Sequence, residues 1–281
     1  MHKGGKWANQ IIDLQEADGN FGCFHSLSKY HNSPITTEQA LRRLERLGYT
    51  ISDDCIQKAV RYMNDCLTGK NEIPDRKENT HDWSIFTSLM LAAWVRRFTS
   101  DNFMANQIAT QWSQIITSAF STGEYEHNAY VKAYQDILGT RPKGARLIDF
   151  VHFYPLSLLR DTLDSKIENA MIWYVLRKAS GIYYVYDGKI SILPSVFQSK
   201  NASYYLAAIE LLAAYECSKH QLNFVVTWLI KNRNINGKWD MGKGVNDKIY
   251  FPLSDDWRKK EAREADCTER IEKLLFKLQT R

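Results

Sequence analysis

Apolar residues recur along most of the chain every three or four positions, which is the period of an amphipathic α-helix. Strict alternation of apolar and polar residues, the pattern of a half-buried strand, is nearly absent. The apolar spacing therefore predicts ten helices, most of them in closely spaced pairs. They cover residues 6–15, 36–47, 53–67, 81–98, 102–120, 146–163, 165–179, 202–217, 221–231 and 266–279.

Polar residues at the predicted helix starts support these assignments. Capping boxes begin at Thr36 and at Ser165, and Thr80 is the predicted N-cap of the helix that follows it. Two short apolar runs, 182–185 and 190–193, predict one small β-hairpin. The chain is otherwise predicted to be all-α.

Five glycines follow helical patterns at intervals of 50 to 58 residues, which predicts an internal repeat. Glycine can take the left-handed conformation that ends a helix without a steric penalty. In four of the five cases an aromatic residue stands two positions later, where it could pack against the next unit. The glycines are Gly19, Gly69, Gly123, Gly181 and Gly237, and the aromatic residues are Phe21, Tyr125, Tyr183 and Trp239, with Asn71 at the exception.

The repeat resembles a known superfamily. The segment Gln15-x-x-x-Gly19-x-Phe21 is similar to the QW repeat of terpenoid cyclases and protein prenyltransferases, with Phe in place of Trp. A second copy, Arg233-x-x-x-Gly237-x-Trp239, has Arg in place of Gln. The resemblance implies an α/α toroid, a closed ring of about five pairs of inner and outer helices, as a single domain over residues 1–281. The resemblance indicates a shape and not a reaction. We expect the central cavity to bind a small organic ligand, with a terpenoid-cyclase-like or prenyltransferase-like enzyme as one interpretation.

The catalytic motifs of that superfamily are not matched. Class II cyclases use an Asp-x-Asp-Asp run, and neither 52–55 nor 254–257 has this pattern. Prenyltransferases hold zinc with Asp, Cys and a later His, and Asp53-x-Cys55 has only the first spacing. A helix start with a buried cysteine is the preferred interpretation there. No metal and no cofactor is therefore predicted.

Composition excludes several other classes of protein. A chain that is 44% hydrophobic, with 6 prolines and 14 glycines among 281 residues, is neither disordered nor a many-stranded β-protein. The net charge of +5 is modest, and the alternating charges of residues 258–281 are typical of a solvated helix face rather than a nucleic-acid groove. The five scattered cysteines indicate reduced thiols.

The location of the protein is expected to be the cytoplasm. The N-terminal residues lack the apolar run of a signal peptide, and apolar windows such as 88–95 are too short to span a bilayer. A small-molecule partner is expected, with neither nucleic acid nor membrane insertion, and the oligomeric state is left open.

In a toroid the starts of the inner helices meet at one rim, which makes polar residues there candidates for catalysis. The candidates are His81, Asp82, Asp149 and His152, because a histidine beside a carboxylate can move protons near neutral pH. Asp149 and His152 are expected on one face of a helix that Pro155 kinks. The alternative is that Asp82 caps a helix and His152 is a core histidine with its hydrogen bonds satisfied.

Aromatic and charged residues nearby are candidates for ligand binding. Residues 237–265 form an unusually long loop whose aromatic content predicts that it packs across one end of the ring. The candidate ligand-binding residues are Trp83, Tyr154, Tyr204, Asp255, Asp256, Trp257 and Arg258.

Two other functions remain open. Glu124, Glu126, His127 and Tyr130 form a polar-aromatic cluster that a sugar-active hydrolase or lyase could use. A non-catalytic scaffold or binding module would use the ring surface instead.

Overall fold

A computed structural model describes residues 2–26 and 33–279, and every regular element in this part of the chain is helical. The all-α prediction is confirmed. The helices are α1 (Lys6–Ile12), α2 (Thr37–Arg46), α3 (Asp54–Leu67), α4 (Trp83–Phe98), α5 (Phe103–Ala119), α6 (His127–Leu138), α7 (Ala145–Ile148), α8 (Phe153–Leu158), α9 (Ser165–Arg177), α10 (Lys200–Leu212), α11 (Ser218–Gln221), α12 (Asn223–Lys231) and α13 (Lys260–Gln279), with a 3₁₀-helix η1 (Lys243–Val245).

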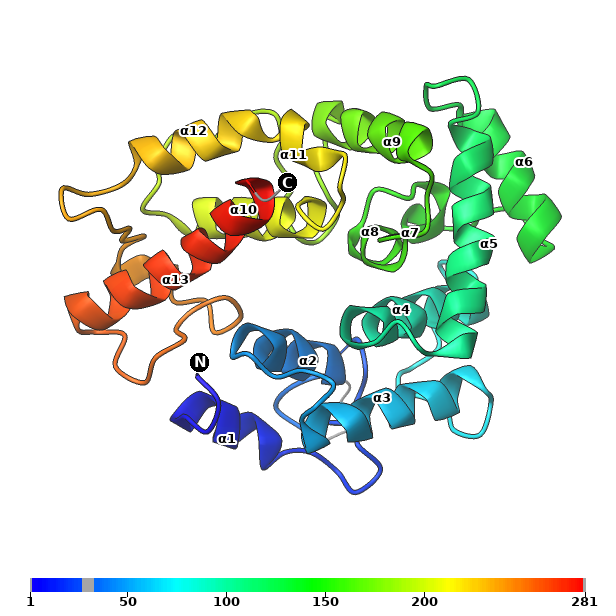
Figure 1. The fold of residues 1–281 in the computed structure, drawn as a ribbon. Coiled ribbons are helices and arrows are strands. Elements are labelled where there is room, and N and C mark those ends of the chain that lie inside the picture. The colour runs from blue at the N-terminus through cyan, green and yellow to red at the C-terminus, as the bar shows by residue number, and fades with distance from the viewer. Residues whose placement is uncertain (1, 27–32, 280–281) are drawn as a thin grey trace.

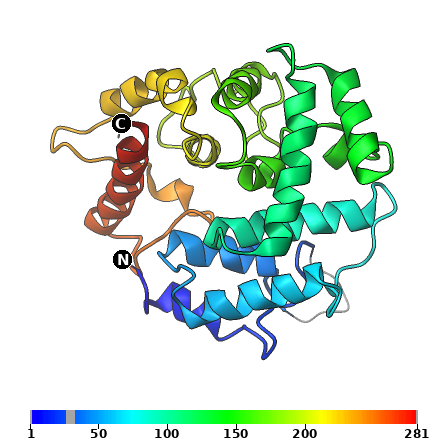
Figure 2. The same cartoon turned by 45° about the vertical axis from the view of Figure 1, so that its right-hand side comes forward.

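The helices lie in two groups around the middle of the molecule. Helices α2, α4, α8, α10 and α13 surround the middle, and α1, α3, α5, α9 and α12 lie outside them (Figures 1 and 2). Helix α4 packs against α3, α5 and α8, and α8 also contacts α10. The N-terminal segment lies beside the last helix and the loop before it, because His2 Nε2 is 2.9 Å from Glu269 Oε2 and the Trp7 indole donates to the Ser254 carbonyl.

Capping side chains account for several of the helix starts, and two of the predicted caps are wrong. The Thr36 capping box is confirmed: its hydroxyl accepts from the Gln39 amide at 3.2 Å. Helix α4 is capped by Asp82 rather than Thr80. Helix α9 is capped by Asp164 rather than by Ser165. The Asp164 carboxylate accepts hydrogen bonds from the backbone amides of Lys166 and Ile167.

The predicted helix 146–163 is broken in the structure. Asp149 and His152 both have extended backbone between α7 and α8, so they do not share a helix face as expected. The Asp149 carboxylate accepts from the Val151 amide at 2.9 Å, which replaces a helical hydrogen bond with a local turn. Pro155 lies in the first turn of α8, where its missing N–H costs nothing, rather than at a kink.

The predicted hairpin is also wrong for the part of the chain that the structure describes. Residues 182–186 make a tight turn closed by an isolated bridge between Ile182 and Tyr186, and residues 187–193 form further turns with no strand. The turn is fixed at Gly181, which has a φ of 59°; a Cβ there would lie 2.3 Å from the Gly188 carbonyl oxygen.

All five repeat glycines have positive φ, as the repeat predicted. Only Gly69 lies directly beyond a helix end, however, after the capping residue of α3. The aromatic partners also differ, since Phe21 and Trp239 are fully buried whereas Tyr183 is half exposed. The repeat therefore marks turns of similar backbone geometry, and not five equivalent helix ends.

The long C-terminal loop packs, as predicted. It includes η1 and buries Trp239, Phe251 and Trp257. Helix α6 was not predicted at all. Among the described residues, no helix is both long and apolar enough to cross a membrane.

Candidate ligand-binding site

A cavity of about 680 Å³ opens between the helices that surround the middle of the molecule. Helices α2, α4, α8, α10 and α13 all contribute to its wall, together with the long C-terminal loop. The residues that line it are Arg42, Glu45, Arg46, Arg97, Phe153, Val185, Ala207, Glu210, Leu211, Tyr250, Leu253, Glu269, Arg270, Glu272, Lys273, Leu274, Phe276 and Lys277. We call this the central cavity.

Helix α2 turns a charged face toward the central cavity. Glu45 and Arg46 lie three and four positions after Arg42, so all three residues are on one side of the helix. The opposite side carries Leu41 and Leu44, both fully buried against the outer layer. The helix is therefore amphipathic in the ordinary way, but its polar side borders an interior space instead of the outer surface.

Ion pairs join the charged residues of the cavity wall. The Arg97 guanidinium donates to both carboxylate oxygens of Glu45 at 2.7 Å. Glu210 pairs with Arg46 and with Arg270, whose Nε lies 2.7 Å from Oε1. Two guanidinium groups thus share the Glu210 carboxylate, which leaves this part of the wall with an excess of positive charge.

These pairs determine the protonation states of the wall. Burial opposes ionisation of Glu210, but the charges of Arg270 and Arg46 outweigh it and hold the pKa of the carboxyl at about 2. Burial lowers the pKa of the Lys277 ammonium, which interacts electrostatically with Glu210, Arg46, Glu45 and Arg97. Among the described residues Lys277 has no hydrogen-bonded or ion-paired partner. The charges of α2, α4, α10 and α13 therefore converge on one region of the cavity.

Aromatic rings hold the guanidinium groups in position. The Tyr250 ring lies 5.0 Å from Arg46 Cζ and 4.9 Å from Arg270 Cζ. The Phe153 ring lies 4.6 Å from Arg42 Cζ. These cation–π contacts restrict the arginine side chains, so the wall presents preorganised cations beside apolar surface.

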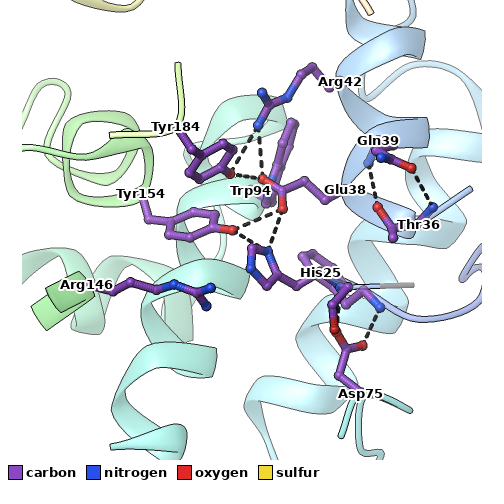
Figure 3. A network of polar contacts seen from close by, with 12 residues as sticks. His25, Thr36, Glu38, Gln39, Arg42, Asp75, Trp94, Arg146, Tyr154 and Tyr184 are labelled. Carbon is purple, nitrogen blue, oxygen red and sulfur yellow. Dashed lines mark hydrogen bonds and ion pairs between the residues drawn. The ribbon is translucent and has the colours of Figure 1, made fainter. Parts of the chain in front are cut away.

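A buried carboxylate, Glu38, forms an ion pair with Arg42 (Figure 3). Its oxygens accept hydrogen bonds from Arg42 and from Tyr154 at 3.0 Å each. Burial opposes ionisation of Glu38, but its hydrogen bond with His25 and the charge of Arg42 outweigh it and hold the pKa at about 2. Within the described residues, its side-chain partners are His25, Arg42, Trp94, Tyr154 and Tyr184.

His25 is itself fixed by a second buried carboxylate. Asp75 accepts from the backbone amides of Phe24, His25 and Ser26, the last two at 2.8 and 3.1 Å. The His25 ring then lies with Nδ1 3.0 Å from Glu38 Oε2 and 2.9 Å from the Tyr154 hydroxyl. The network is a rigid support for Arg42 (Figure 3).

Of the four predicted catalytic residues, Asp149 and His152 line one small pocket beside the break between α7 and α8, and His81 and Asp82 are not part of it. His81 is buried against Phe86, with ring centroids 4.4 Å apart, and Asp82 caps α4 through the Ile85 amide. Asp149 forms an ion pair with Lys178, and His152 is buried between α7 and α8. None of the four lines the central cavity. For Asp82 the alternative of a capping role is correct.

The predicted ligand-binding residues are also outside the cavity wall. Tyr154 belongs to the Glu38 network, and Trp83 lies half-buried beside His81. Tyr204 is 6.2 Å from the Tyr250 ring. In the C-terminal loop, Asp255 accepts from the Lys6 amide, Asp256 pairs with Lys259, Trp257 packs on Phe251, and Arg258 is exposed.

The remaining clusters have structural roles. Glu126 is at the N-cap position of α6, but its side chain makes no capping hydrogen bond, and the exposed His127 is 3.0 Å from the Tyr125 hydroxyl. Tyr130 is buried, and its hydroxyl donates to the Leu147 carbonyl. Asp53 and Cys55 lie at the start of α3 as expected. Within residues 2–26 and 33–279, no group of three or more His, Cys, Asp or Glu side chains could hold a metal ion.

Sequence reasoning missed the charged residues of the central cavity. They belong to α2, α4, α10 and α13, and they are Arg42, Glu45, Arg46, Arg97, Glu210, Glu269, Arg270, Glu272, Lys273 and Lys277. The signal was present as Arg and Glu at helical spacing in 38–46. It is the same signal that an outer solvated face gives, and only the packing of distant helices distinguishes the two.

Comparison of the chain with protein-family models, with curated proteins and with solved structures gave no match. The function is therefore argued from the site alone.

Proposed function

We propose that this protein is an α/α toroid whose central cavity binds a small organic ligand with an anionic group and an apolar or aromatic body. The observation that carries the proposal is the composition of the cavity wall. It has six basic and four acidic side chains, beside Phe153, Tyr250, Leu253 and other apolar residues.

The position of the charges favours an anion over a cation. Glu45 and Glu210 are already engaged by arginines, so they are not available to a ligand cation. Each guanidinium has five N–H donors and can still donate to a further oxygen. Arg46, Arg97 and Lys277 are the groups that we expect to contact a carboxylate, phosphate or sulfonate.

The size of the central cavity suits a small molecule. Ligand pockets typically occupy about 300–1,000 Å³ and combine apolar walls with a few polar groups. The 680 Å³ of this cavity is within that range. The helices arranged around it support the toroid, since an inner layer and an outer layer can both be traced (Figure 1).

Binding is favoured over catalysis because the four candidate catalytic side chains lie away from the cavity. Glu38 and Glu210 have a pKa of about 2, so neither can donate a proton near neutral pH. A reaction of the class II cyclase type would require such an acid.

A fluorescence titration with 8-anilino-1-naphthalenesulfonate tests the proposal, because this dye has an anionic group on aromatic rings. The neutral N-phenyl-1-naphthylamine has both ring systems and lacks the sulfonate, so it isolates the contribution of charge. We expect one dye site, with the sulfonated dye bound more tightly than the neutral one.

Lys277→Gln should weaken binding of the sulfonate dye by about fivefold and leave the neutral dye unchanged, because it removes one partly exposed ion pair. Lys166→Gln is the matched control, since Lys166 is exposed on α9 and does not line the cavity. Equal binding of both dyes, or equal effects of the two substitutions, would contradict the proposal.

A further inference from the structure

One side chain of the central cavity is polar but uncharged. Of the described residues that line the cavity, this is true of Tyr250 alone. Tyr250 belongs to the long C-terminal loop and is only 4% exposed. Its ring contacts the guanidinium groups of Arg46 on α2 and Arg270 on α13. The phenol therefore lies beside the cations of two different helices.

The Tyr250 hydroxyl has no hydrogen-bond partner within the part of the chain that the structure describes. The backbone amide of Tyr250 donates to Asp247 at 2.8 Å, and the side chain makes no hydrogen bond. Some unpartnered polar atoms are fully enclosed, such as the Tyr134 hydroxyl, but the Tyr250 oxygen is not one of them. Because Tyr250 lines the cavity, its oxygen is open to a molecule bound there.

The charges around this hydroxyl determine which kind of ligand group it can meet. The phenol interacts electrostatically with Arg42 and Arg46, and its ring contacts Arg270. A ligand atom beside the hydroxyl is therefore close to three guanidinium groups, which favour an oxygen with negative charge over a cationic or apolar group. A phenol can donate to such an oxygen, and hydrogen bonds to charged acceptors are the strong ones.

The backbone holds the phenol in place before any ligand binds. One carboxylate oxygen of Asp247 accepts from three successive backbone amides, those of residues 249–251, at 2.9, 2.8 and 3.2 Å. The neighbouring Phe251 ring lies 5.0 Å from Arg270 Cζ, so the loop and α13 are in contact on both sides of the Tyr250 backbone. Little conformational entropy is therefore lost when the hydroxyl binds an acceptor.

We propose that Tyr250 is a ligand-binding residue whose hydroxyl donates a hydrogen bond to an anionic oxygen of the ligand. The inference rests on the proposed function, because it takes the central cavity as the ligand site. It adds the place where the anionic group binds, which is beside Tyr250 and the arginines of α2 and α13. A ligand without an oxygen acceptor leaves the buried donor unpaired, so the hydroxyl selects against such ligands.

Tyr250→Phe tests the inference, because it removes the hydroxyl and keeps the ring that packs on Arg46 and Arg270. The probes are again 8-anilino-1-naphthalenesulfonate and the neutral N-phenyl-1-naphthylamine. We expect Tyr250→Phe to bind the sulfonate dye at least about tenfold more weakly, because a hydrogen bond to a charged oxygen is lost, and to bind the neutral dye as before. The free energy of unfolding should not fall, because the hydroxyl has no partner among the described residues.

Tyr215→Phe is the matched control and should show the opposite pattern. The Tyr215 hydroxyl donates to the Leu156 carbonyl at 2.7 Å, and Tyr215 is outside the cavity wall. This substitution should lower the free energy of unfolding and leave the affinity for both dyes unchanged. The inference is overturned if Tyr250→Phe keeps full affinity for the sulfonate dye, loses affinity equally for both dyes, or loses as much stability as Tyr215→Phe.

The inference and the proposed function fail in different ways. Suppose that the wild-type chain prefers the sulfonate dye and that Lys277→Gln weakens its binding. Full affinity of Tyr250→Phe for that dye would then overturn the role of the hydroxyl and leave the proposed function standing. Equal binding of the two dyes by the wild-type chain would overturn both.

Discussion

Removal of the Glu210 charge is the most informative change to the central cavity. Glu210 is the shared counterion of Arg46 and Arg270, and the Arg270 side chain is only 4% exposed. Glu210→Gln keeps the size of the side chain and its capacity to accept hydrogen bonds. It leaves two guanidinium groups, one of them almost fully buried, without a balancing charge.

The pKa of Glu210 gives the expected magnitude. Its usual value of 4.5 falls to about 2 in the folded chain, which corresponds to ~3 kcal/mol of folding stability at neutral pH. Because the folded-state pKa is the lower one, this stability is present above about pH 4.5 and is lost as the pH falls toward 2. Glu210→Gln should therefore lower the free energy of unfolding by ~3 kcal/mol at pH 7, and by ~2 kcal/mol near pH 3.5.

Urea denaturation followed by circular dichroism at both pH values measures this difference. Glu216→Gln is the control, because Glu216 forms an exposed pair with Lys219 and its loss should cost less than about 0.5 kcal/mol. A Glu210→Gln effect below about 1 kcal/mol, or one of the same size at both pH values, would refute the assignment of Glu210 as a buried shared counterion.

Three further substitutions test the fold by urea denaturation. Gly19→Ala should lower the free energy of unfolding by about 2 kcal/mol or more, because φ is 101° and the added Cβ would lie 2.4 Å from a carbonyl oxygen of α3. Gly244→Ala, with open space around the added Cβ, should lower it far less. Equal effects of the two substitutions would contradict the close approach of Gly19 to α3. Asp82→Ala should cost about 1 kcal/mol by removing the α4 cap, and no change would rule that cap out. Phe21→Ala should lower the free energy of unfolding by about 3–5 kcal/mol and Tyr183→Ala by less than about 1 kcal/mol, because only Phe21 is buried. Similar values would mean that the two repeat aromatics are equivalent.

Local signals predicted the fold class and most helices. The Thr36 capping box and the apolar spacing that follows it located α2 to within a residue at each end. Helix α6 shows that such signals can be overlooked, because its buried positions Tyr130, Ala133 and Tyr134 do have helical spacing. Tyr130 was assigned instead to the polar-aromatic cluster with Glu124, Glu126 and His127.

The breaks in the predicted elements depend on contacts that no local pattern contains. The extended segment between α7 and α8 is held by the Asp149 ion pair with Lys178, 29 residues later. The turn at Gly181 is held by close approach to Gly188 and Tyr186. A helix and a hairpin were the best local solutions for these stretches, and tertiary contacts override both.

The candidate site was the least predictable feature. Glu210 and Arg270 lie 60 positions apart, and each alone is an ordinary charged residue on an amphipathic helix. The sequence does not distinguish a polar face that meets solvent from one that meets an enclosed space. The sequence pattern favoured histidines and clustered carboxylates as candidates, but in the structure Asp82 caps α4 and His152 is buried between α7 and α8.

A crystal structure of the protein with 8-anilino-1-naphthalenesulfonate tests the central claim most directly. We predict that the dye occupies the central cavity, with its rings against Phe153 or Tyr250 and its sulfonate within hydrogen-bond distance of Arg46, Arg97 or Lys277. A dye bound only at the outer surface, or a central cavity filled by its own side chains, would contradict the assignment of this cavity as a site for an anionic ligand.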